Sequence, residues 1–161
     1  MATPVRELIQ GSPHAVHLDE AVDEVFRLMM GVPCAPGEES VPEDRETITA
    51  VIGLAGAMSG ACTMRCGQQT ALRMAECMVG VRPEEMDATV KDAIGEVCNM
   101  VAGAWKGRHA VLAAGCMLST PAVVTGTNYQ LHMQRPEFRV DRSYQFEEHT
   151  VSISLICESI Q

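Results

Sequence analysis

Apolar residues recur at helical spacing in three parts of the chain. Residues 17–30 place apolar side chains on one face and acids on the other, which predicts an amphipathic helix. Residues 68–79 repeat this pattern and stop before Gly80, a residue type that commonly ends helices. A longer pattern runs from Pro83, which suits the first turn of a helix, to about Gly107. We therefore expect three helices, of which the last is the longest.

The remaining apolar positions predict strands. Residues 46–54 and 60–66 flank a short Gly-bounded stretch, which favours a β-hairpin. Residues 108–118 fit the tail of a helix or an edge strand equally well. Pro121 and Gly126 then bracket a short Val-rich run at 122–125. Three later runs predict strands: 129–134, 138–146 and 150–157. Helices and strands that are grouped rather than alternating favour an α+β fold with an antiparallel sheet packed against long helices.

The chain has the size and composition of one domain. Its 161 residues are 47% hydrophobic, enough to bury a sizeable core. Residues 31–45 contain three prolines and four acids, which predicts a mobile acidic loop. No internal repeat is visible, so we expect a single domain over residues 1–161.

Charge limits the classes of partner. The formal net charge is −9, which disfavours nucleic-acid backbones and anionic membrane surfaces as partners. No apolar run approaches the roughly 18 residues of a membrane span, and the first residues lack a signal-peptide pattern. We expect a cytoplasmic protein that binds neither nucleic acid nor membrane.

The seven cysteines do not form a recognisable framework. Cys62 and Cys66 lie in a predicted strand, where residues four apart are separated by roughly 13 Å. That distance is too long for a shared metal ion or a disulfide. Reduced, packed thiols are the favoured interpretation, and a cysteine-based redox or metal function is a weaker alternative.

The long third helix carries the most distinctive chemistry. Asp92, Glu96 and Asn99 are spaced so that they share one face, opposite the apolar stripe. Acids and amides at such spacing also occur on ordinary solvated helix faces, because short motifs arise often by chance.

Small residues surround this acid and amide. They are Gly95, Ala102 and Gly103. A glycine inside a helix costs roughly 1 kcal/mol relative to alanine, so two of them suggest a purpose. The expected purpose is close approach of a partner to a bare helix surface. Helix packing across a dimer is the alternative.

The segment 92–103, DAIGEVCNMVAG, resembles the signature helix of the CheC/CheX/FliY phosphatases. Their pattern is Asp or Ser, three residues, Glu, two residues and Asn. Here the pattern occurs once, preceded by VIGLAG at 51–56 and followed by TPAVVTG at 120–126, which makes the chain most similar to CheX. The resemblance extends from about residue 17 to the end.

The resemblance implies a CheC-like fold, a homodimer whose sheets join, and dephosphorylation of CheY-like receiver domains. It implies that Glu96 binds a receiver lysine and that Asn99 reaches the phospho-aspartate and orients the attacking water. On this interpretation the small side chains of Gly95, Ala102 and Gly103 let the helix backbone approach the partner-binding surface of the receiver, and Asp92 either shapes the edge of the site or contacts the partner. No cofactor is expected in this chain, and Mg²⁺ is expected in the receiver.

The implied chemistry is physically reasonable. Hydrolysis of an acyl phosphate needs mainly a positioned water, because the phosphoryl group is already activated and the receiver's Mg²⁺ neutralises its charge. An amide can accept from water and donate to a phosphoryl oxygen without titrating. The alternative is a non-catalytic adaptor that binds a receiver or another signalling partner through the same helix.

Overall fold

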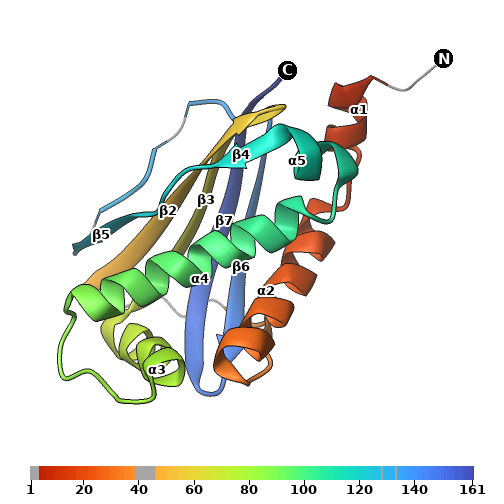
Figure 1. Ribbon diagram of the computed structural model, residues 1–161. Coiled ribbons are helices and arrows are strands. Elements are labelled where there is room, and N and C mark those ends of the chain that lie inside the picture. Colours follow the sequence, from red (N-terminus) through yellow and green to blue (C-terminus); the bar gives the residue numbers. More distant parts are fainter. Residues whose placement is uncertain (1–3, 39–45, 128, 133) are drawn as a thin grey trace.

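In a computed structural model, which describes residues 4–38, 46–127, 129–132 and 134–161, helices lie against one antiparallel sheet (Figure 1). The helices are α1 Val5–Gln10, α2 His14–Met30, α3 Gln68–Val79, α4 Ala88–Lys106 and α5 Ala110–Gly115. The strands are β1 Ala35–Pro36, β2 Thr47–Gly56, β3 Met58–Gly67, β4 Cys116–Leu118, β5 Ala122–Gly126, β6 Phe138–Phe146 and β7 His149–Ile160. The predicted α+β class is confirmed.

The sheet is built around the hairpin of β2 and β3. Its order is β1-β6-β7-β3-β2-β4, and β5 also pairs with β2, so β4 and β5 share one edge. The predicted hairpin is confirmed and is longer at both strands than expected. On β3, Cys62, Met64 and Cys66 are buried beneath the helices, whereas Thr63 and Arg65 face the other side of the sheet.

Three helices cover one face of the sheet. α4 lies across this face, with α2 and α3 packed against it (Figure 1). Large side chains fill the space between the layers; Trp105 of α4 is 1% exposed, and the Phe26 and Phe146 rings lie 5.1 Å apart. Burial of these apolar surfaces supplies most of the driving force that holds α4 in place.

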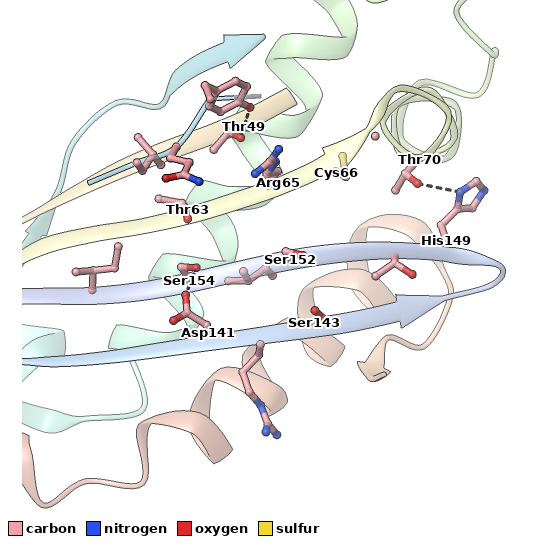
Figure 2. A pocket seen from close by; sticks show the side chains of 18 of the residues that line it. Thr49, Thr63, Arg65, Cys66, Thr70, Asp141, Ser143, His149, Ser152 and Ser154 are labelled. Atoms are coloured by element: carbon pink, nitrogen blue, oxygen red, sulfur yellow. Dashed lines mark hydrogen bonds between the residues drawn. The ribbon is translucent and has the colours of Figure 1, made fainter. Parts of the chain in front are cut away.

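The opposite face of the sheet is polar. Hydroxyl side chains and charged groups of β3, β6 and β7 line a hollow there (Figure 2). The segment that begins at Tyr129 crosses this face, and the Tyr129 hydroxyl is hydrogen-bonded to Thr49 and Thr47.

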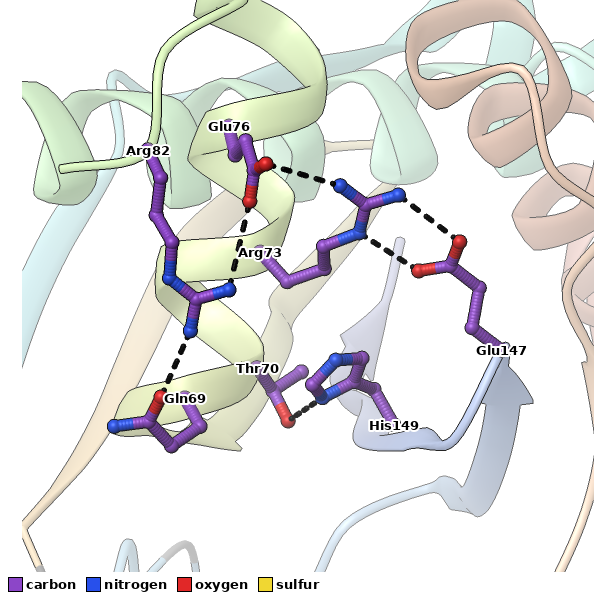
Figure 3. A network of polar contacts seen from close by, with 7 residues as sticks. All are labelled: Gln69, Thr70, Arg73, Glu76, Arg82, Glu147 and His149. Carbon is purple, nitrogen blue, oxygen red and sulfur yellow. Dashed lines mark hydrogen bonds and ion pairs between the residues drawn. The ribbon is translucent and has the colours of Figure 1, made fainter.

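A polar network fastens the turn between β6 and β7 to α3 (Figure 3). Arg73 donates from Nε and Nη2 to the two carboxylate oxygens of Glu147, at 2.8 and 3.0 Å. These hydrogen bonds from the guanidinium hold the pKa of the Glu147 carboxyl below its ordinary value. Thr70 and His149 are hydrogen-bonded at 3.1 Å in the same network. The free end of the β6–β7 hairpin is therefore fixed to the helix layer.

Two of the three predicted helices are confirmed, and the third begins later than expected. α3 has the expected bounds and ends at Gly80, whose φ of 88° is left-handed. α4 starts at Ala88 rather than at Pro83, because the Asp87 side chain accepts from the Val90 N–H at 3.1 Å and caps the helix there.

The segment 108–118, for which the sequence allows a helix or an edge strand, contains both, since it forms α5 and then β4. The strand expected at 129–134 is wrong over the described residues there. Those residues lie over the polar face of the sheet and do not pair with a neighbouring strand. The Tyr129 hydroxyl, hydrogen-bonded to Thr47 and Thr49, holds them there.

The segment 31–45 is only in part the loop that its prolines predict. Ala35–Pro36 pair with β6, and the N–H of the buried Cys34 donates to Asp23 at 3.0 Å. The expected mobility at residues 39–45, the second part of this segment, lies outside the described residues. Within the described ranges, no helix combines the length and apolarity that crossing a membrane would take.

Candidate active site

The three residues singled out on the long helix lie on α4 as the sequence predicts. Asp92 and Glu96 are exposed and Asn99 is half-buried. Their spacing of four and three residues places them on one side of α4. The opposite side of the same helix carries Val97 and Val101, which are buried in the core.

The backbone beneath Asn99 is held firmly. Cys98, its neighbour in the chain, is fully buried and lies over the hairpin. Its sulfur lies 3.7 Å from the carbonyl oxygen of Cys62 on β3 and 3.8 Å from that of Ala50 on β2, and its single S–H is shared between these two weak acceptors. Close packing on that side limits movement of this turn of α4. The Asn99 side chain therefore projects from a rigid support, as a positioning group requires.

The polar side chains on this face of α4 have no partners within the described part of the chain. Across the described residues, no side-chain hydrogen bond or ion pair is formed by Asp92, Glu96 or Asn99. The two carboxylates give the face a negative charge, which favours a cationic group on a partner. An external group can therefore bind here without breaking internal contacts.

The expectation that Gly95 and Ala102 form a bare, exposed floor is wrong. Ala102 is 0% exposed, and Gly95 is buried by its own chain. A Cβ added at Gly95 would lie 3.1 Å from Pro121 Cβ and 3.5 Å from a methyl of Val123. The glycine thus allows close packing within the molecule. These two residues are therefore covered by the chain itself and do not form an exposed surface.

Gly103 is the small residue that stays partly open. It is half-buried, and the nearest side-chain atom to an added Cβ is Leu118 Cδ1 at 3.8 Å. Of the four residues expected to contact a partner, only Asp92 and Gly103 are accessible on this helix.

The sequence did not predict that the loop before β5 packs beside α4. The loop before β5 brings Pro121 against the helix one residue from Glu96. Ser119 fixes this loop, because its hydroxyl accepts from the Gly53 N–H at 2.8 Å and donates to the Thr120 carbonyl at 3.0 Å. The only signal in the sequence was the TPAVVTG segment, which marked the loop without indicating its place.

The cysteines and histidines offer no clear metal centre. All seven cysteines are free, and six of them are buried. Cys62 and Cys66 face the core, where burial raises the pKa of the Cys66 thiol to about 12. No cluster of three or more histidine, cysteine or acidic residues suited to a metal ion occurs in the part of the chain that the structure describes.

The fold is that of a known class of proteins. The structure of a CheC-like superfamily protein from Shewanella matches with a TM-score of 0.74 and 23% identity, covering 89% of this chain and 96% of that one. The family model described as "Chemotaxis phosphatase CheX" matches residues 48–141, which is more than half of the chain. The chain therefore belongs to the CheX family.

Two relatives connect this family with an activity and a partner. A CheY-P phosphatase CheX from Thermotoga maritima is 27% identical over 115 residues, 69% of this chain and 74% of that protein. The structure of a CheX–CheY–BeF₃–Mg²⁺ complex from Borrelia burgdorferi matches with a TM-score of 0.74 and 18% identity, covering 91% of this chain and 98% of that one. The latter likeness is one of fold.

Proposed function

We propose that this protein dephosphorylates the phospho-aspartate of a CheY-like receiver domain. The observation that carries the proposal is the pair Glu96 and Asn99 on one face of α4, unpaired within the described structure and available to a partner. Membership of the CheX family and the name of the Thermotoga relative support it. The reaction is attack of water on an acyl phosphate, which yields a free receiver carboxylate and inorganic phosphate.

In this proposal Asn99 positions the water. Its amide oxygen accepts a hydrogen bond from the water, and its NH₂ donates to a phosphoryl oxygen. Such positioning is most of the catalysis when the phosphoryl group is already activated. The rigid support from the buried Cys98 favours this role, because little freedom must be lost when the complex forms.

Glu96 docks the receiver. Its exposed carboxylate lies one turn from Asn99 and pairs with a lysine of the receiver. A charge pair at the rim of a complex contributes orientation and speed of encounter more than affinity. Asp92, exposed one turn before Glu96, extends the same negative surface, and Gly103 leaves room at the other end.

Mg²⁺ belongs to the receiver in this proposal, where it neutralises phosphoryl charge. The protein itself supplies the amide, the carboxylate and the helix that holds them. The active site is therefore complete only in the complex, with one half on α4 and the other on the receiver.

The decisive assay measures phosphate release from a phosphorylated receiver with Mg²⁺. Asn99→Ala should slow release by about 100-fold, the scale expected when a reacting group loses its positioning. Thr89→Ala is the matched control, since Thr89 is also exposed on α4 but lies nearer its start. An unchanged rate in Asn99→Ala contradicts the assigned role. Receiver binding without any acceleration by the wild type would instead select the adaptor function.

Docking is tested separately by affinity. Glu96→Lys should weaken binding to the receiver, and the loss should shrink as salt concentration rises, because exposed charges are screened. Replacement of the receiver's lysine by glutamate should restore part of the affinity to Glu96→Lys. Equal affinity for wild type and Glu96→Lys removes the docking role.

We also propose that the protein acts as a cytoplasmic homodimer. β1 covers β6 only at Tyr144 and Gln145, which leaves the rest of that edge without a partner strand among the described residues. Open sheet edges favour pairing or cover, and two-fold symmetry is the common solution. Light scattering at micromolar concentration tests this, and a monomeric mass would count against it.

A further inference from the structure

The hollow on the face of the sheet opposite α4 is a polar cavity. Its volume is about 660 Å³, and it is lined by strands β2, β3, β6 and β7 together with residues 129–131 (Figure 2). The helix layer and the proposed phosphatase site are on the other side of the sheet, so this cavity has no part in the chemistry assigned to Asn99.

The strand register lines up donor groups across the floor of this cavity. Arg65 of β3 pairs directly with Thr49 of β2 and with Ser152 of β7. Ser152 in turn pairs with Ser143 of β6. Directly paired residues have side chains close enough to act on one small ligand. Arg65 thus lies in a row of hydroxyl-bearing residues that crosses the sheet.

Arg65 lacks the partner that other arginines here possess. Every other described arginine except Arg135, which is exposed, forms an ion pair with a carboxylate, whereas Arg65 is half-buried and forms none. Its Nε is buried and has no hydrogen-bond partner among the described residues. Buried donors are nearly always satisfied, so an unpartnered guanidinium N–H suggests a missing acceptor.

Neighbouring groups hold Arg65 in place but leave its charge unmatched. The Tyr129 ring centre lies 5.1 Å from the Arg65 Cζ, which covers one face of the guanidinium. Two acids line the cavity, and neither forms an ion pair with Arg65. Asp141 is already occupied, since it accepts from Arg139 at 2.7 Å and from Ser154 at 2.5 Å, and Glu148 is exposed. An arginine fork with hydroxyls beside it matches the acceptor atoms of an oxyanion.

We propose that this cavity binds a small oxyanion, of the carboxylate or phosphate class, between the Arg65 guanidinium and the hydroxyl of Ser152. The ligand accepts from the guanidinium, including its buried Nε–H, and from Ser152, whose hydroxyl forms no other hydrogen bond within the described structure. Because the whole protein carries a charge of −9, binding depends on this local cation rather than on the overall field.

The test titrates the full-length protein with inorganic phosphate and, separately, with succinate, by calorimetry and by NMR. Wild type should bind at least one of them saturably at one site per chain, with shifts at cavity residues. Arg65→Gln should weaken binding by at least about tenfold, the loss expected for a charged hydrogen bond. Ser152→Ala should weaken it less. Arg135→Gln is the matched control and should bind as wild type does.

Three results overturn the proposal. One is the absence of saturable binding of either anion by wild type. Another is equal weakening in Arg135→Gln. The third is that the NMR signals of the cavity residues shift with protein concentration and not with added anion. That result would make this face an interface between copies of the chain. Circular dichroism shows whether Arg65→Gln is folded. If it is not, anion binding by Ser152→Ala tests the proposal, and affinity equal to that of wild type overturns it.

The test is independent of the phosphatase proposal. Arg65→Gln should dephosphorylate the receiver at the wild-type initial rate in a buffer without added phosphate or carboxylate, because Arg65 lies across the sheet from α4. A failure of anion binding thus leaves the role of Asn99 untouched. Inactivity of the wild type toward a receiver likewise leaves the anion site intact.

Discussion

Pro121 lies against the backbone of Gly95 on α4, so closely that a Cβ added to the glycine would meet Pro121 Cβ at 3.1 Å and Cγ at 3.3 Å. The loop before β5 is thereby packed on the helix next to Glu96. The two glycines of α4, Gly95 and Gly103, therefore differ in purpose. The first permits a contact inside the chain, and the second leaves open surface.

The two glycines should respond differently to alanine. Gly103→Ala should raise the free energy of unfolding by up to about 1 kcal/mol, because alanine favours a helix and the nearest side-chain atom is 3.8 Å away. Gly95→Ala should raise the free energy of unfolding by less than Gly103→Ala does, or should lower it, because Pro121 must move to make room. Gly95→Val should cost about 1–3 kcal/mol through overpacking. Urea denaturation measures all three, and equal gains in the two alanine variants contradict this assignment.

Stability should depend on the protonation of His14. This ring is 7% exposed, stacks on Phe138 at 4.3 Å and bonds to the Ile9 carbonyl at 2.5 Å. Burial, the largest cause, lowers the pKa of His14 from its ordinary value of 6.5. The unfolded chain then binds the proton more readily, so stability is full above pH 6.5 and falls as pH drops below it.

Chemical denaturation at pH 7 and at pH 5 checks this dependence. His14→Leu should lose stability at pH 7 with the Ile9 hydrogen bond, but its further loss on going to pH 5 should be smaller than in wild type. His132→Gln, at an exposed histidine, should keep the wild-type slope. An unchanged slope in His14→Leu assigns the pH dependence to other groups.

The buried hydroxyl of Tyr144 should contribute measurably to the free energy of unfolding. It is fully buried, and its hydroxyl donates to Asp19 Oδ1 at 2.6 Å, which links β6 to α2. Tyr144→Phe should cost about 1–3 kcal/mol, because a hydrogen bond to a charged acceptor is removed in a shielded place. Thermal or urea unfolding measures this loss. Arg27→Gln, which breaks the exposed pair with Asp23, should cost much less.

One cysteine should react in the native state. Cys77 is half-buried, whereas the other six thiols are buried. Burial raises the pKa of the Cys77 thiol as well as that of the Cys34 thiol, the latter to about 12, so access of the reagent to the sulfur distinguishes Cys77. An aromatic disulfide reagent at neutral pH should modify one thiol quickly and the rest after denaturation. Cys77→Ser should abolish the fast phase, and a fast phase in that variant would refute the assignment.

Local signals in the sequence predicted most of the elements. Apolar periodicity and Gly80 gave the bounds of α3, because the helix and its end depend on adjacent residues. The start of α4 that Pro83 predicts is too early, because the side chain of Asp87 caps the helix four residues later. Both residues were visible in the sequence, and only geometry distinguished them.

The sequence by itself determined that Asp92, Glu96 and Asn99 share a helix face, because helical periodicity fixes that relation. Only the tertiary structure decided what surrounds them. Pro121 covers Gly95 because the sheet carries β5 back beside α4, a contact distant in sequence. Arg65 likewise faces a cavity through strand pairing. Spacing along one element is local information, whereas burial depends on which segments the fold brings together.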